Sequence, residues 1–153
     1  MKDSKNLVKS TVLLAALLFV ATWFFYDRIL DIILPTVNRG FYQSTGEESE
    51  IKALILICFS VALFPVFIAA AWVFSPIQSA KNRLLSALVI LTCVLLAVFF
   101  RYQSIKDYFS MMAEGTMFNV AFPFEDIHFD LYILAGLCIG FIISYVVCRE
   151  KQK

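Results

Sequence analysis

The residues best suited to chemistry are the chain's single histidine and its acidic neighbours. His128 lies between Asp126 and Asp130. An imidazole close to carboxylates can bind a divalent metal ion or act as a general base. Acidic residues at the start of a helix are also stabilised by the positive end of the helix dipole. Two interpretations follow: a weak metal or catalytic site, and ordinary surface residues that begin a helix. The sequence favours the second.

The other reactive residues point away from catalysis. The four cysteines, Cys58, Cys93, Cys138 and Cys148, form no C-x-x-C pair and lie within or at the end of apolar runs. This disfavours a thiol oxidase and indicates small buried side chains. We find no Ser/His/Asp arrangement, phosphate-binding glycine loop, haem motif or nucleic-acid-binding patch. We therefore expect no catalytic residue, no cofactor and no nucleic-acid partner.

Four apolar runs organise the chain. With 153 residues, of which 61% are hydrophobic, it is too apolar for a soluble domain. Each run is close to the roughly 20 residues with which a helix crosses a bilayer, and helices satisfy their own backbone polar groups in lipid. The first ends in an aromatic belt, Trp23 to Tyr26, which indicates a retained anchor instead of a cleaved signal. The runs are 8–26, 53–74, 84–100 and 131–148.

The charges divide by side of the membrane. Eight of the thirteen bases lie on one side, with only two acids: seven in the two terminal segments and the connection 75–83, and Lys9 at the start of the first run. The connections 27–52 and 101–130 hold the other five bases and ten acids. Lys and Arg accumulate in cytoplasmic connections. The sequence therefore predicts cytoplasmic N- and C-termini, an inner loop 75–83 and outer loops 27–52 and 101–130, in a plasma or bacterial inner membrane.

Helical spacing continues beyond the apolar runs on the outer side. After residue 100, apolar residues recur at helical intervals until Gly115, which is a plausible stop; they are Tyr102, Ile105, Phe109 and Met112. The first helix is expected to continue through Ile33. Thr45 and Glu48 fit a capping box for the second helix. The predicted fold is a single all-α domain, 1–153: an up-and-down bundle of four transmembrane helices with a small extracytoplasmic cap formed by helix extensions.

Two sets of residues are candidates for binding. The outer segment 116–129 contains Phe118, Phe122 and Phe124, with Pro123 between them and a helix expected to begin near Glu125 or Asp126. These aromatic side chains either pack on the cap or headgroups, or form a recognition surface together with Tyr102, Ile105 and Phe109. Small residues on one face of the fourth helix allow another helix to approach closely, and we favour a helix of the same chain. They are Gly136, Gly140 and Ser144.

The layout resembles that of bacterial immunity proteins, which protect a producer cell from its own pore-forming colicin. Length, helix number and termini carry this resemblance, and plasmid exclusion proteins and accessory subunits share it. It implies a non-catalytic protein of the bilayer that binds another membrane or periplasmic protein. The alternative is a small membrane enzyme or transporter that acts at the outer headgroups through His128, Asp126, Asp130 and Arg101. The apolar runs contain no deep ionisable residue that would mark a transport path.

Overall fold

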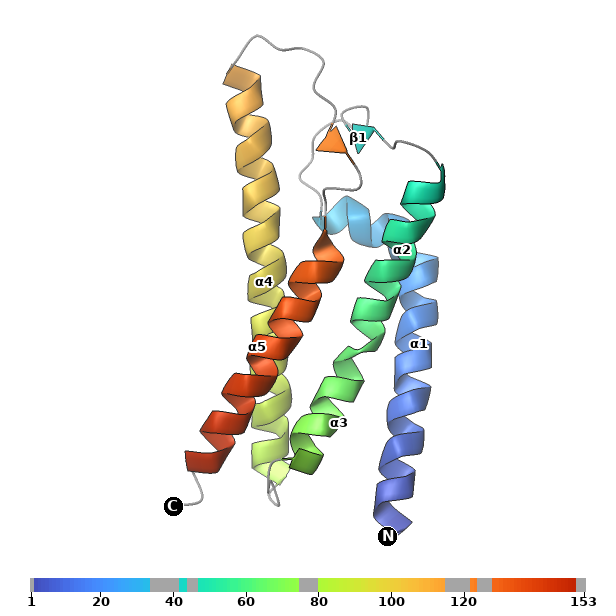
Figure 1. Cartoon of the computed structure of the whole chain (residues 1–153), viewed down its shortest axis with the longest axis vertical. Helices are drawn as coiled ribbons and strands as arrows, with labels where there is room; N and C mark the ends of the chain where they lie inside the picture. The colour runs from blue at the N-terminus through green and yellow to red at the C-terminus, as the bar shows by residue number, and fades with distance from the viewer. Residues whose placement is uncertain are drawn as a thin grey trace.

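The computed structural model is an all-α bundle of long apolar helices (Figure 1). It describes the backbone of residues 2–33, 42–43, 47–74, 80–114, 122–123 and 128–150. Side chains are described for 6–26, 28, 51–74, 80–108 and 128–147. Both chain termini lie at one end of the bundle, which we call the terminus end, and two short strands lie at the other, the strand end (Figure 1).

Five helices make up four candidate membrane spans. The helices are α1 (Lys2–Ile33), α2 (Glu47–Ala62), α3 (Phe64–Phe74), α4 (Ala80–Glu114) and α5 (Phe129–Glu150). By length and composition the candidate spans are Asn6–Tyr26, Ile51–Phe74, Ala80–Tyr108 and Phe129–Val147. The protein is thus an integral membrane protein with four candidate spans, and the predicted all-α four-helix bundle is confirmed.

Two helices continue past their apolar runs, as the sequence predicts. The first helix ends at Ile33 and α4 ends at Glu114, directly before Gly115. The second begins at Glu47, while Thr45 of the expected capping box lies outside the described residues. The last begins at Phe129, later than the predicted start; Glu125 and Asp126 also lie outside the described residues.

Pro65 divides the second apolar run into α2 and α3. Backbone bonds of helical spacing continue on both sides, from Leu63 N to Phe59 O and from Phe67 N to Leu63 O, each 3.0 Å. Proline has no N–H to donate to the carbonyl of Val61, and its ring crowds that carbonyl. The apolar run 53–74, expected as one uninterrupted helix, therefore consists of two helical segments that together form one candidate span (Figure 1).

Two short strands join the two loops of the strand end. β1 (Tyr42–Gln43) pairs in parallel with β2 (Phe122–Pro123), with Tyr42 opposite Phe122 and Gln43 opposite Pro123. This pairing is not visible in the sequence, because two residues are too few to show the alternation that marks a strand. The pairing ties the connection after α1 to the connection before α5.

The described core consists of two clusters along the bundle axis. One cluster contains Ile57, Ile105 and Phe129, from α2, α4 and α5. The other contains Ala71, Ile90, Ile133 and Leu137, from α3, α4 and α5. No described side chain of α1 belongs to the buried set of either cluster. That helix packs beside α2 and α3, whereas α4 packs mainly against α5.

Candidate functional site

Helices α4 and α5 approach each other closely at two glycines of α5. A Cβ atom added at Gly136 would lie 2.7 Å from the Cα atom of Val94, and one added at Gly140 would lie 2.8 Å from the Cα atom of Ile90. Both distances are shorter than side chains tolerate, so only glycine fits at this spacing. The small-residue face predicted on the fourth helix therefore lies against α4 of the same chain.

A buried pair of hydroxyl groups continues this contact. The Oγ atoms of Ser86 and Ser144 lie 2.6 Å apart, and neither serine is exposed. Along α5 the contacts advance in steps of four residues, and along α4 the facing positions Val94, Ile90 and Ser86 advance by the same step in the opposite direction. The three contacts thus form one stripe between the antiparallel helices α4 and α5. The pair of Ser86 and Ser144 is the contact of this stripe that lies nearest the terminus end.

Two other hydroxyl groups inside the spans bond to their own helix. Ser60 Oγ donates to the carbonyl of Leu56 at 2.9 Å, and Thr92 Oγ1 donates to the carbonyl of Leu88 at 2.8 Å. The serine pair differs from these bonds, because it joins two helices. Ser86 and Ser144 are 58 positions apart in the sequence, so their pairing depends on how α4 and α5 pack.

Among the candidate partner-binding residues, Ile105 requires a correction. Its side chain is only 1% exposed and packs with Ile57 and Phe129, so it belongs to the core and is not accessible to a partner. Tyr102 is half-buried. The side chains of Phe109 and Phe122 and the whole of Phe118 and Phe124 lie outside the described residues.

His128 has a structural role at the start of α5. Its carbonyl accepts bonds from the backbone N–H groups of Leu131 at 3.1 Å and Tyr132 at 3.3 Å, which caps the first turn. Its φ of +48° is in the left-handed region, and its side chain is exposed. Asp130 lies in that first turn, where the helix dipole favours an acid. The described residues contain no group of three or more potential metal ligands, and Asp126 lies outside them.

Arg101 contacts aromatic and hydroxyl groups of its own chain. Its guanidinium carbon lies 5.5 Å from the centre of the Tyr132 ring, and its Nη1 donates to Ser104 Oγ at 3.5 Å. A cation over an aromatic face is stabilised by the ring's electrons. This contact joins α4 to the first turn of α5, which gives Arg101 a packing role at the strand end.

The described cysteines form no disulfide. Cys58 is buried, Cys93 half-buried and Cys138 exposed, and all three are free thiols. Cys93 packs at the helix contact, since its Cβ atom would lie 3.2 Å from a Cβ added at Gly140. Cys148 lies outside the described side chains.

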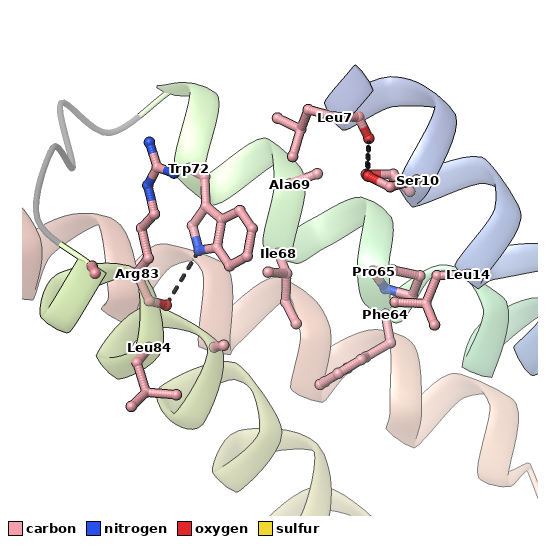
Figure 2. Close-up of a pocket in the computed structure, with 13 residues that line it drawn as sticks. Leu7, Ser10, Leu14, Phe64, Pro65, Ile68, Ala69, Trp72, Arg83 and Leu84 are labelled. Carbon is pink, nitrogen blue, oxygen red and sulfur yellow. Dashed lines mark hydrogen bonds between the residues drawn. The ribbon is translucent and has the colours of Figure 1, made fainter. Parts of the chain in front are cut away.

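A groove of about 580 Å³ opens between α1, α3 and α4 at the terminus end (Figure 2). Its volume is within the range of about 300–1,000 Å³ that is usual for small-molecule sites. The groove is not visible in the sequence, because it depends on the separation of α1 from α4. The lining residues are Leu7, Ser10, Thr11 and Leu14 of α1, Phe64, Pro65, Ile68, Ala69 and Trp72 of α3, and Ala80, Arg83, Leu84 and Ala87 of α4.

Trp72 and Arg83 hold one end of the groove together. The indole Nε1 of Trp72 donates to the carbonyl of Arg83 at 3.2 Å, and the guanidinium carbon of Arg83 lies 5.9 Å from the centre of the Trp72 ring (Figure 2). The side chain of Arg83 is exposed while Trp72 is half-buried. The groove therefore combines apolar walls with one fixed cation at its end.

Comparison of the chain with protein-family models, with curated proteins and with solved structures found no match.

Proposed function

We propose that this protein is non-catalytic and acts by binding another membrane or periplasmic protein through the strand end of the bundle. The observation that supports this most directly is the length of α4, which has 35 residues. At 1.5 Å per residue such a helix is about 52 Å long, whereas the hydrocarbon core is about 30 Å thick. A substantial part of α4 is therefore available outside the bilayer.

The packing register favours the strand-end part of α4 as the binding element. If the four-residue steps of the stripe continue, Phe129, the first residue of α5, lies near Arg101 of α4. The last 13 residues of α4, from Tyr102 to Glu114, then extend past the start of α5 over about 20 Å. This part of α4 has no α5 residue beside it along most of its length.

The described side chains of this extension suit a protein interface. Ser104, Lys106 and Asp107 are exposed and Tyr102 is half-buried. Interfaces combine aromatic residues with a polar rim. Phe109, Phe118, Phe122 and Phe124 remain candidates for the same surface on sequence grounds alone.

The side of the membrane follows from the charges. Eight of thirteen bases belong to the terminus end, which supports cytoplasmic termini and a strand end on the periplasmic or extracellular side. Because the small-residue face of α5 is covered by α4, a partner is better accommodated at the strand end than along that face. An immunity, exclusion or accessory-subunit role fits such a protein, with the partner a second membrane or periplasmic protein.

Photocrosslinking in intact cells tests the proposal. A photoreactive residue is introduced at Asp107, and the control variant carries it at Leu95, which is 60% exposed on the same helix but lies within the apolar run 84–100. We expect a discrete protein adduct from position 107 that is absent from position 95. Adding Ser104→Arg, which places a bulky cation one turn away, should weaken that adduct. The same adducts from both positions, or none from 107, would contradict the proposal.

A further inference from the structure

The groove at the terminus end is shallow along the membrane normal. On α1 its lining runs from Leu7 to Leu14, and on α4 from Ala80 to Ala87. Eight residues of helix span about 12 Å, which is less than the roughly 15 Å that one leaflet contributes to the hydrocarbon core. The groove therefore suits a ligand that occupies one leaflet.

The walls of the groove are compatible with a hydrocarbon chain. Ser10 Oγ and Thr11 Oγ1 both donate to the carbonyl of Leu7, at 2.9 and 2.8 Å, and the Trp72 indole donates to Arg83. These donors are thus already satisfied within the protein, which lowers the cost of covering them with an apolar ligand. Leu84 is 63% exposed at the rim, so the groove has an apolar edge where it meets lipid.

The charge at the mouth of the groove is positive. Arg83 lines the groove. Lys9 directly precedes the lining residue Ser10, Lys81 directly follows the lining residue Ala80, and both lysines are exposed. A guanidinium keeps its charge at every physiological pH and presents several N–H donors in a fork that matches phosphate oxygens.

We propose that this groove binds an anionic phospholipid of the leaflet at the terminus end. One acyl chain lies between α1, α3 and α4, and the phosphate is held by Arg83, whose guanidinium is positioned by the Trp72 ring. The neighbouring lysines add attraction for a second negative charge in the headgroup. The inference is independent of the partner proposed for the strand end, because the two sites lie at opposite ends of the bundle (Figure 1).

Charge and depth favour a lipid over a helix of another protein as the occupant. A transmembrane helix would contact the bundle over most of the roughly 30 Å hydrocarbon core, but the lined length is less than about half of that. A lipid also combines the two properties that the site combines, an apolar chain and an adjacent anion.

Fluorescence quenching by brominated lipids tests this inference on the full chain. The sequence has two tryptophans, so Trp23→Phe leaves Trp72 as the reporter in the groove, and Trp72→Phe leaves Trp23 as the matched control. Trp23 is 43% exposed and lies at the far end of the α1 span. Each variant is placed in phosphatidylcholine vesicles with a small share of either brominated phosphatidylglycerol or brominated phosphatidylcholine, brominated near the carbonyl end of the acyl chain.

We expect brominated phosphatidylglycerol to quench Trp72 more strongly than brominated phosphatidylcholine does. The binding constant of phosphatidylglycerol should be about fivefold higher, because one cation attracts an anionic lipid by an amount of this size. Arg83→Gln should remove this preference, and Ala69→Phe, which fills the groove, should reduce quenching by both lipids. Trp23 should report equal quenching by the two lipids in every variant, and its unchanged signal verifies that each variant is folded and inserted.

Three results would overturn the inference. Equal quenching of Trp72 by both lipids would show that the groove has no preference for an anion. A preference that survives Arg83→Gln would remove the assigned phosphate ligand. Weak quenching of Trp72 by either lipid, together with a protein crosslink from Ala69, would assign the groove to a protein.

Discussion

Gly136 and Gly140 set the distance between α4 and α5, and adding one methyl group at each position tests that contact. A Cβ at Gly136 would lie 2.7 Å from the Cα atom of Val94, while ordinary contact begins at 3.4 Å, so the backbones must separate locally by the difference, 0.7 Å. For Gly140 and Ile90 the corresponding distances are 2.8 and 3.4 Å, a difference of 0.6 Å. Both neighbours are backbone atoms, which cannot rotate away.

The free-energy cost follows from these displacements. A gap of about 0.5–1 Å forfeits a quarter to a half of the dispersion attraction across it, and overpacking typically costs about 1–3 kcal/mol. Replacing a helical glycine by alanine normally returns about 0.5–1 kcal/mol. We therefore expect Gly136→Ala and Gly140→Ala each to lower the free energy of unfolding by about 0.5–2 kcal/mol. The double variant should lose less than the sum, because one separation relieves both contacts.

Reversible unfolding in mixed micelles, followed by far-ultraviolet circular dichroism, measures these free energies. Ala135→Val is the matched control: it adds two methyl groups at the exposed neighbouring position of α5 and should change stability by less than about 0.5 kcal/mol. The reasoning is refuted if the two glycine variants are as stable as the control, or more stable than the unmodified protein.

Three further predictions concern other features of the bundle. In a double-mutant cycle of Ser86→Ala and Ser144→Ala, we expect a coupling energy of about 0.6–1.7 kcal/mol by the same unfolding assay, and additive effects would contradict the hydroxyl pair. Pro65→Ala restores a backbone donor, so spin labels on α2 and α3 should report a longer, narrower distance distribution; an unchanged one would assign the break to another cause. At His128, where φ is +48°, glycine should be tolerated and valine should lower stability by about 1–2 kcal/mol; equal stability of the two variants would contradict the backbone role.

The sequence predicted the helices because their signals are local and long. Four apolar runs, the helical spacing after residue 100 and Gly115 as a stop are all readable along the chain, and the structure has α4 ending at Glu114. Pro65 was equally visible, but a proline inside a long apolar run either bends or divides the helix, and only the neighbouring packing decides the outcome.

The contacts between helices could not be predicted in the same way. The pairing of Ser86 with Ser144, and the burial of Ile105 in the core, depend on the relative rotation and register of α4 and α5. Within the apolar runs no polar outer face reveals that rotation. After residue 100 the helical spacing of Tyr102, Ile105 and Phe109 fits a core-facing stripe and a partner surface equally well. The groove near Arg83 likewise depends on the separation of α1 from α4.

Cysteine accessibility tests most directly the central claim that four spans place the terminus and strand ends on opposite sides of a membrane. In a variant with its four native cysteines replaced by alanine, single cysteines are introduced at the exposed positions Asn6, Lys81 and Lys106. A membrane-impermeant maleimide should label position 106 in intact cells and positions 6 and 81 only after the membrane is permeabilised. Labelling of positions 6 and 106 from the same side would contradict the four-span arrangement, and the reversed pattern would contradict the orientation inferred from the charges.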